Sequence, residues 1–154
     1  MIFVGDFHIH SKYSRACSPQ MDLENLALWA KIKGIKVLGT GDFTHPKWFC
    51  NLKEKLIPAE PGLFKLKSDA NTETRFVLTS EISCIYSKTG KVRKIHIIVF
   101  APDFGTVEKI NTQLAKIGNL KADGRPILGL DAKNLAKIVV LLRDFVSVNC
   151  RKMI

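Results

Sequence analysis

The sequence lacks the cysteine arrangements that stabilise secreted domains or hold structural zinc. Its four cysteines stand far apart and include no C-x-x-C pair: Cys17, Cys50, Cys84 and Cys150. We therefore expect reduced thiols in a cytoplasmic protein and no disulfide framework. No apolar run approaches the ~20 residues that cross a bilayer, and the first ten residues lack the features of a signal peptide.

Nucleotide-binding and serine-hydrolase motifs are also missing. The sequence has no G-x-x-x-x-G-K-[ST] loop for a nucleotide triphosphate and no G-x-S-x-G elbow. Acidic residues are few: the sequence has 14 Asp and Glu but 24 Lys and Arg, which gives a formal charge of +10. Such a charge favours an acidic partner, of which nucleic acid is the commonest, although charge alone does not identify it.

The chain of 154 residues, 46% of them hydrophobic, is long enough for one domain with a real core. "MIFVGDFHIH" predicts a strand, "MDLENLALWAKIKG" a helix between Asp22 as N-cap and Gly34, and "IKVLGTGD" a second strand. A strand, helix and strand in succession predict a parallel pair. The predicted fold class is α/β.

The rest of the chain predicts further helices and a hairpin. Residues 43–74 are expected to be irregular apart from a short helix around "PKWFCNLKEKL", and "SKTGK" marks the turn of a hairpin over residues 75–104. A loop, "NLKADGRPILGL", separates two amphipathic helices, and "FVSVNC" is expected to open another strand. The residues predicted to be buried on these two helices are Val107, Ile110, Leu114 and Ile117 on the first and Leu135, Ile138, Val139 and Leu142 on the second.

Potential metal ligands occur at every second position near the start of the chain. Asp6, His8 and His10 would share one face of the predicted strand. Imidazole and carboxylate ligands favour Zn²⁺, Mn²⁺ or Fe²⁺ over Ca²⁺. An isolated H-x-H pair is, however, more often a pair of ordinary histidines beside a strand-end Asp.

Other polar residues strengthen the metal interpretation. Asp42 follows the second predicted strand, with His45 three residues on, and ligand sites gather at the carboxyl ends of parallel strands. Glu81 lies in an apolar strand where an unpaired carboxylate is costly, and His96 lies in the partner strand. The ordinary alternatives are a turn residue for Asp42, a solvent-facing loop residue for His45, an edge charge for Glu81 and a core histidine for His96. Taken together, these residues predict a metal site.

The motifs "DFHIHSKYSR" and "GTGDFTHP", followed by a strand Glu and a strand His, resemble the PHP family (polymerase and histidinol phosphatase) of metal-dependent phosphoesterases. "TSEISCIYSKTGKVRKIHIIVFAP" and "DGRPILGLDAKNLAKI" resemble its endonuclease Q branch, over essentially the whole chain. The resemblance implies the N-terminal strands of a distorted seven-stranded β/α barrel, that is, a partial PHP-type barrel. It also implies two or three divalent ions in the complete domain, with Zn²⁺ first and Mn²⁺ or Mg²⁺ as alternatives.

The resemblance further implies an endonuclease of DNA repair, which hydrolyses the phosphodiester 5′ to deaminated bases or abasic sites. His8, His10, Glu81 and His96 match metal ligands, and Asp42 matches the acid of the second motif. The expected catalytic set is His8, His10, Asp42 and Glu81. Asp6 and His45 match less securely, either as ligands or, for Asp6, as a carboxylate that orients a histidine.

Several basic residues are candidates for holding the DNA backbone: Lys12, Arg15, Lys47, Lys91, Arg93 and Lys94. Two rival interpretations stay open, a PHP phosphatase acting on a small phosphomonoester and a non-catalytic basic module that binds nucleic acid. The resemblance implies that residues 1–154 are an incomplete PHP domain, without the later barrel strands, the zinc-binding domain and the C-terminal helical region. The resemblance therefore implies a chain that is weak or inactive by itself.

Overall fold

The computed structural model describes residues 2–69 and 71–141. They form a mixed α/β fold with a seven-stranded open sheet and four helices, which confirms the predicted class. The elements follow one another as β1 (Val4–Asp6), α1 (Leu23–Lys33), β2 (Ile35–Gly39), α2 (Pro46–Lys55), β3 (Leu56–Pro58), β4 (Phe64–Leu66), β5 (Arg75–Lys88), β6 (Lys91–Ala101), α3 (Phe104–Leu114), β7 (Ile127–Leu128) and α4 (Ala132–Leu141).

The first three elements form the predicted strand–helix–strand unit. Helix α1 begins after Asp22, whose side chain accepts a hydrogen bond from the Asn25 backbone N–H, and ends at Gly34 in a left-handed conformation. Strands β1 and β2 pair in parallel, as predicted. The first strand is shorter than expected, however, because regular pairing stops at Asp6 and the histidines lie in the extended segment beyond it.

Strand β5 is the centre of the sheet. It pairs in parallel with β2, and its first part also pairs with the antiparallel β3–β4 ribbon. This ribbon corrects the prediction that residues 56–66 are irregular. Each of its strands has only three residues, too few to show a periodic pattern in the sequence.

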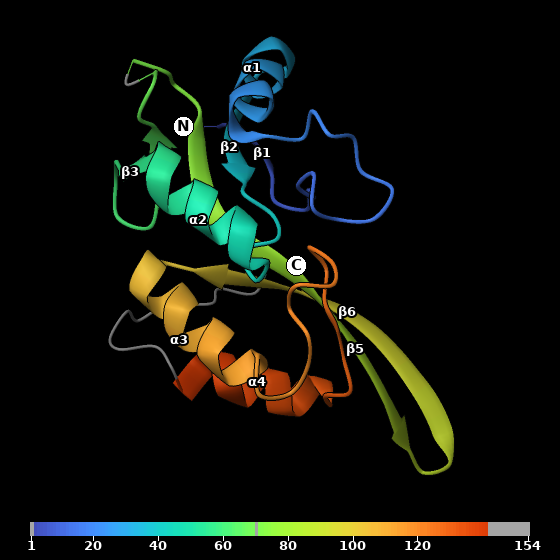
Figure 1. Cartoon of the computed structure of the whole chain (residues 1–154). Helices are drawn as coiled ribbons and strands as arrows, with labels where there is room; N and C mark the ends of the chain where they lie inside the picture. Colours follow the sequence, from blue (N-terminus) through green and yellow to red (C-terminus); the bar gives the residue numbers. More distant parts are fainter. Residues whose placement is uncertain (1, 70, 142–154) are drawn as a thin grey trace.

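From Leu78 onward, β5 forms the predicted long hairpin with β6. Thr89 and Gly90 make the turn with positive φ values of 52° and 72°, as the glycine in the turn indicated. The two strands run together past the helices, so that the turn extends away from the body of the molecule (Figure 1). The hairpin therefore has a buried base and an exposed far end.

The last two helices pack against each other and against β6. Helix α3 begins after Asp103 and buries Val107, Ile110 and Leu114, as predicted. The prediction is wrong for Ile117, which is exposed because the helix ends at Leu114. On α4, Leu135 is buried, while Ile138 and Val139 are partly buried. The predictions for Leu142 and "FVSVNC" lie outside the described residues.

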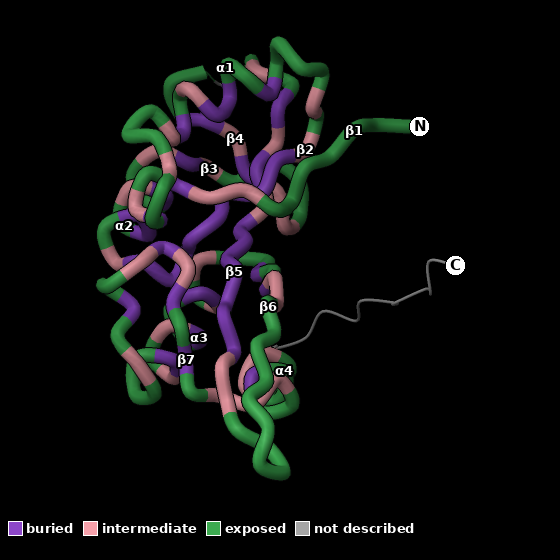
Figure 2. The backbone as a smooth tube through the Cα atoms, turned by 90° about the vertical axis from the view of Figure 1, so that its right-hand side faces the viewer, coloured by how far each residue is buried: buried purple, intermediate pink, exposed green. Residues whose placement is uncertain are grey.

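Burial follows β5 through the molecule (Figure 2). Phe76, Leu78 and Ile82 on this strand are fully buried, and Trp48 on α2 packs into the same core. The Trp48 indole N–H donates to the carbonyls of Thr40 and Gly41, at 3.2 and 2.9 Å, and so holds the turn after β2. Within the part of the chain that the structure describes, none of the helices has the length and apolar character needed to cross a membrane.

Candidate metal centre

Two histidines reach the site from the extended segment after β1. This segment crosses directly over the glycine-rich turn that follows β2. A Cβ atom on Gly41, whose φ is 61°, would lie only 2.4 Å from the carbonyl oxygen of Ile9. Glycine is therefore required there, and the close approach brings His8 and His10 toward β5.

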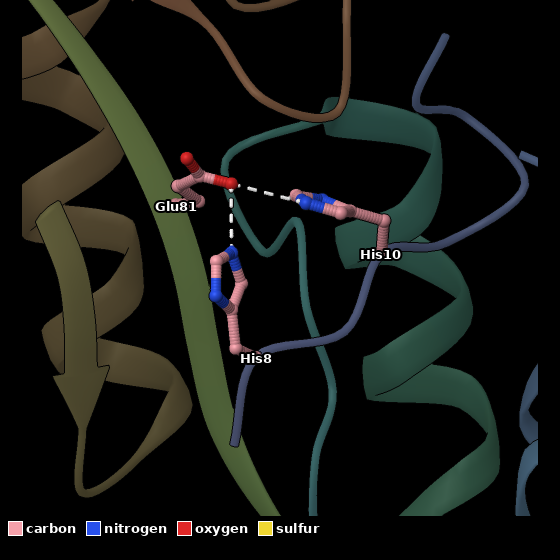
Figure 3. Close-up of side chains that lie close together, drawn as sticks. All are labelled: His8, His10 and Glu81. Carbon is pink, nitrogen blue, oxygen red and sulfur yellow. Dashed lines mark hydrogen bonds and ion pairs between the residues drawn. The ribbon is translucent and has the colours of Figure 1, made fainter. Parts of the chain in front are cut away.

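Glu81 on β5 is the centre of the cluster (Figure 3). Its carboxylate is almost fully buried, with a side-chain exposure of 3%. Nε2 of His8 and Nε2 of His10 each lie 3.0 Å from Oε2 of Glu81. The two rings therefore meet at one carboxylate, but the prediction that they share a strand face with Asp6 is wrong, because β1 ends at Asp6.

The other carboxylate oxygen of Glu81 contacts Nδ1 of His96. His96 lies on β6 opposite Ser83, whose hydroxyl is 3.2 Å from the second ring nitrogen of His96. Three of the four histidines of the chain therefore meet at one glutamate. The rings of His8 and His96 are about half exposed, whereas the glutamate between them is buried, so the cluster opens to solvent on its histidine side.

The carboxylate of Asp42 contacts the His10 ring at Nδ1, whereas Glu81 contacts the same ring at Nε2. The buried Asp42 carboxylate is 3.0 Å from Nδ1 of His10 and accepts hydrogen bonds from the Ser11 backbone N–H and the Ser11 and Ser14 hydroxyls. The backbone of Asp42 has a φ of 50°, which costs energy for a residue with a side chain. These contacts fix His10 with its Nε2 directed at Glu81, as carboxylates commonly do for metal-binding histidines.

The histidines and carboxylates of the cluster shift one another's pKa values. Burial by itself raises the pKa of Glu81, but hydrogen bonds from His8 and His96 outweigh it and leave that pKa below its usual range. The hydrogen bond to Asp42 is the largest influence on His10 and raises its pKa, against the effect of burial. The pKa of Glu81 is therefore lowered by the histidines around it, whereas the pKa of His10 is raised by the carboxylates of Asp42 and Glu81.

Asp6 and His45 lie outside this cluster. The Asp6 carboxylate accepts a hydrogen bond from the His8 backbone N–H at 3.2 Å. The His45 ring stacks on Tyr13 at 4.5 Å, its Nδ1 has no partner among the described residues, and burial lowers its pKa. The alternative of a solvent-facing His45 is therefore wrong.

The donor set fits a divalent metal. One ligand atom each from His8, His10 and Glu81 lies within 4.8 Å of the others. Among the residues that the structure describes, no other group of three or more His, Cys, Asp or Glu meets this condition. Two imidazoles and a carboxylate are typical of zinc sites that keep an open coordination position. The histidines contact the glutamate directly, through atoms that are all potential ligands.

The predicted DNA-contacting residues are exposed and fall into two groups. Lys91, Arg93 and Lys94 lie on β6, toward the far end of the hairpin. The other three belong to the segment after His10 and the first turn of α2. They are Lys12, whose ammonium lies 5.8 Å from the centre of the Tyr13 ring, Arg15, which pairs with Asp123 at 3.5 Å, and Lys47.

Sequence reasoning missed three contributors to the cluster. Ser11 and Ser14 follow the H-x-H motif and hold Asp42, and their spacing from His10 was the available signal. Arg125 was placed in a loop, yet its guanidinium lies 3.9 Å from Oε2 of Glu81. Its contact with Glu81 joins segments that are distant in sequence, which residue type alone does not reveal.

The chain is similar to proteins of known structure over most of its length. No family model matches it. An uncharacterized protein of Methanocaldococcus jannaschii is 29% identical over 140 residues, which are 90% of this chain and 15% of that protein. The crystal structure of the lesion-specific endonuclease PfuEndoQ from Pyrococcus furiosus matches with a TM-score of 0.77 and 30% identity over 92% of this chain.

A second solved structure, endonuclease Q in complex with a duplex substrate that has an abasic lesion at the active site, gives a TM-score of 0.77 and 31% identity. These structural neighbours confirm the resemblance to endonuclease Q that the sequence indicated. This chain spans 33% of the length of each endonuclease chain.

Proposed function

We propose that this chain is the metal-binding part of a DNA-repair endonuclease of the endonuclease Q type. The reaction is hydrolysis of the phosphodiester 5′ to a deaminated base or an abasic site. The observation that carries the proposal is the convergence of His8, His10 and Glu81 in a fold similar to a lesion-specific endonuclease. The abasic duplex bound to a similar chain and the formal charge of +10 support DNA as the partner.

The proposal includes a structural assignment. The open sheet corresponds to the N-terminal strands of a PHP-type β/α barrel, within a PHP domain of which residues 1–154 are one part. All three residues of β1, at one end of the strand order, are exposed, as expected of a strand that would be covered in a closed barrel.

His8, His10 and Glu81 would hold one divalent ion, with His96 as a further ligand in a site of two or three ions; the buried carboxylate of Asp42, expected from the sequence to be a ligand, instead orients His10. Zn²⁺ is the first choice for this donor set, and Mn²⁺ and Mg²⁺ are the alternatives. Such an ion supplies Lewis acidity toward a phosphate group and lowers the pKa of water in its coordination sphere.

The residues of the chain perform the remaining tasks. The serine hydroxyls hold Asp42, and Asp42 holds His10 in the orientation that directs its Nε2 outward. Glu81, enclosed by β5 and β6, stays ionised because the histidines stabilise its charge. The exposed lysines and arginines of the hairpin and of the segment after His10 would contact phosphates of the duplex.

Metal content of the purified chain tests the site. We expect near-stoichiometric zinc or manganese by elemental analysis after dialysis, and a loss of most of it in Glu81→Gln, because this change removes a carboxylate ligand. Glu73→Gln is the matched control, since Glu73 is exposed and pairs with Lys36 away from the cluster. Wild-type chain without metal, or equal retention by both variants, would favour the non-catalytic binding module.

Substrate preference tests the reaction. With the metal-loaded chain in excess over a labelled duplex, we expect slow nicking on the 5′ side of an abasic site or uracil, and none with Glu81→Gln. The same preparation is assayed on a small phosphomonoester in parallel. Phosphate release from the phosphomonoester without nicking would favour the phosphatase instead.

A further inference from the structure

The loop before β7 brings an arginine to the edge of the histidine cluster. Strand β7 pairs in parallel with β5, with Ser83 opposite Ile127. Arg125 lies in the loop two residues before Ile127, and Glu81 lies two residues before Ser83 on β5. Nη1 of Arg125 lies 3.9 Å from Oε2 of Glu81.

Backbone hydrogen bonds hold the loop that carries Arg125 on both sides of this residue. The Gly124 N–H donates to the carbonyl of Tyr13 at 3.0 Å, and the carbonyl of Pro126 accepts from the Ser83 N–H at 3.0 Å. The Arg125 N–H donates to the side chain of Asp123, also at 3.0 Å. The backbone around Arg125 is therefore held in place, and its side chain, which is 40% exposed, reaches both solvent and the carboxylate of Glu81.

An ion pair with Glu81 does not by itself explain why an arginine lies beside the cluster. The contact is the longest that this carboxylate makes, and both of its oxygens already have histidine partners. A positive group beside a cation site also weakens cation binding by repulsion. The arrangement becomes favourable when an anion lies between the two charges, and the planar guanidinium suits phosphate because it can donate two parallel hydrogen bonds.

We propose that Arg125 forms an anion subsite at the rim of the cluster and binds a non-bridging oxygen of the phosphodiester that is cleaved. This inference rests on the proposed function, and it adds a substrate-contacting residue that the metal-binding motifs do not include. The rings of His8 and His96 are about half exposed, so solvent reaches the cluster beside these histidines.

Phosphate affinity measured apart from metal affinity tests the subsite. The zinc-loaded chain is titrated by calorimetry with inorganic phosphate and then with a duplex that contains one abasic site. For Arg125→Gln we expect unchanged zinc content and phosphate affinity about tenfold or more lower, as for loss of a charge-assisted hydrogen bond. The phosphate affinity of Arg125→Lys should lie between those of the wild type and Arg125→Gln, because lysine keeps the charge but not the paired donors.

Lys116→Gln is the matched control. It removes one positive charge from a side chain that hydrogen-bonds to Gln113, just after α3, and it should leave phosphate affinity unchanged. Wild-type phosphate affinity in Arg125→Gln would overturn the inference, and so would loss of zinc with phosphate affinity preserved, which indicates a purely structural ion pair. Failure of the zinc-loaded wild type to bind phosphate would also overturn it, while the zinc site would stand. Failure of the wild type to bind zinc would instead count against the proposed function.

Discussion

Asp42 illustrates how the site depends on single side chains with little freedom. The aspartate carboxylate is fully buried and is held by two serines and one histidine. Gly124 closes the space around it, since a Cβ atom there would lie 2.4 Å from Oδ2 of Asp42 and 2.5 Å from the Ser14 hydroxyl. The loop that carries Arg125 is therefore packed directly on the residue that orients His10.

The tight packing at Gly124 predicts a large cost for one added methyl group. Gly124→Ala should lower the free energy of unfolding by about 1–3 kcal/mol through overpacking, and should weaken zinc binding because Asp42 must move. Urea unfolding and zinc content are the measurements. Gly129→Ala is the control, because no atom lies within 4 Å of a Cβ at that position. Equal effects of the two substitutions would contradict the prediction.

At the level of elements, the β5–β6 hairpin contributes both to the histidine cluster and to a basic surface. Its buried base carries Glu81 and positions it opposite β6, which carries His96. Its far end is exposed and carries a row of basic residues, and it projects beyond the helices (Figure 1). One continuous element therefore links the cluster to a surface suited to the phosphates of a duplex.

Charge removal on the hairpin should weaken DNA binding without affecting the metal. Replacing Lys91, Arg93 and Lys94 by Gln should reduce duplex affinity and lower the slope of log affinity against log salt by about 0.9 for each phosphate that the protein no longer neutralises. Binding is measured over a series of salt concentrations. The control replaces three exposed lysines away from the hairpin, Lys31 and Lys33 in the last turn of α1 and Lys36 at the start of β2. The same slope in both triple variants would argue against a DNA-contacting hairpin.

At the scale of the whole molecule, the cluster ties together distant parts of the chain. His8 and Glu81 are 73 residues apart in sequence, and they come from the segment after β1 and from the central strand. A ligand that binds the folded chain but not the unfolded one stabilises it by mass action. A metal at this cluster would therefore stabilise the sheet as a whole.

Zinc should raise the melting temperature of the chain. At a free concentration about a hundredfold above its Kd, the stabilisation should be roughly 2.7 kcal/mol. Thermal scans with and without zinc measure it, and a chelator should reverse it. Glu81→Gln should show little of this shift, whereas Glu73→Gln should keep it. A shift of the same size in Glu81→Gln would place the bound zinc elsewhere.

Local features of the chain were determined by the sequence alone. Asp22 and Gly34 mark the ends of α1, Gly90 marks the hairpin turn, and the strand–helix–strand succession predicts the parallel pair of β1 and β2. These features depend on backbone preferences and on periodicity within one element, which neighbouring residues are enough to set. The sequence alone also showed the residue types of a metal site and the resemblance to endonuclease Q.

Only the tertiary structure decided which of those residues meet. His8, His10 and His96 converge on Glu81, while Asp42 lies behind His10 and His45 stacks on Tyr13. The contact between Arg125 and Glu81 joins the loop before β7 to the central strand. Spacing along a strand sets the direction of each side chain, but the partner it finds depends on pairing between distant segments, and that pairing is selected by the packing of the common core.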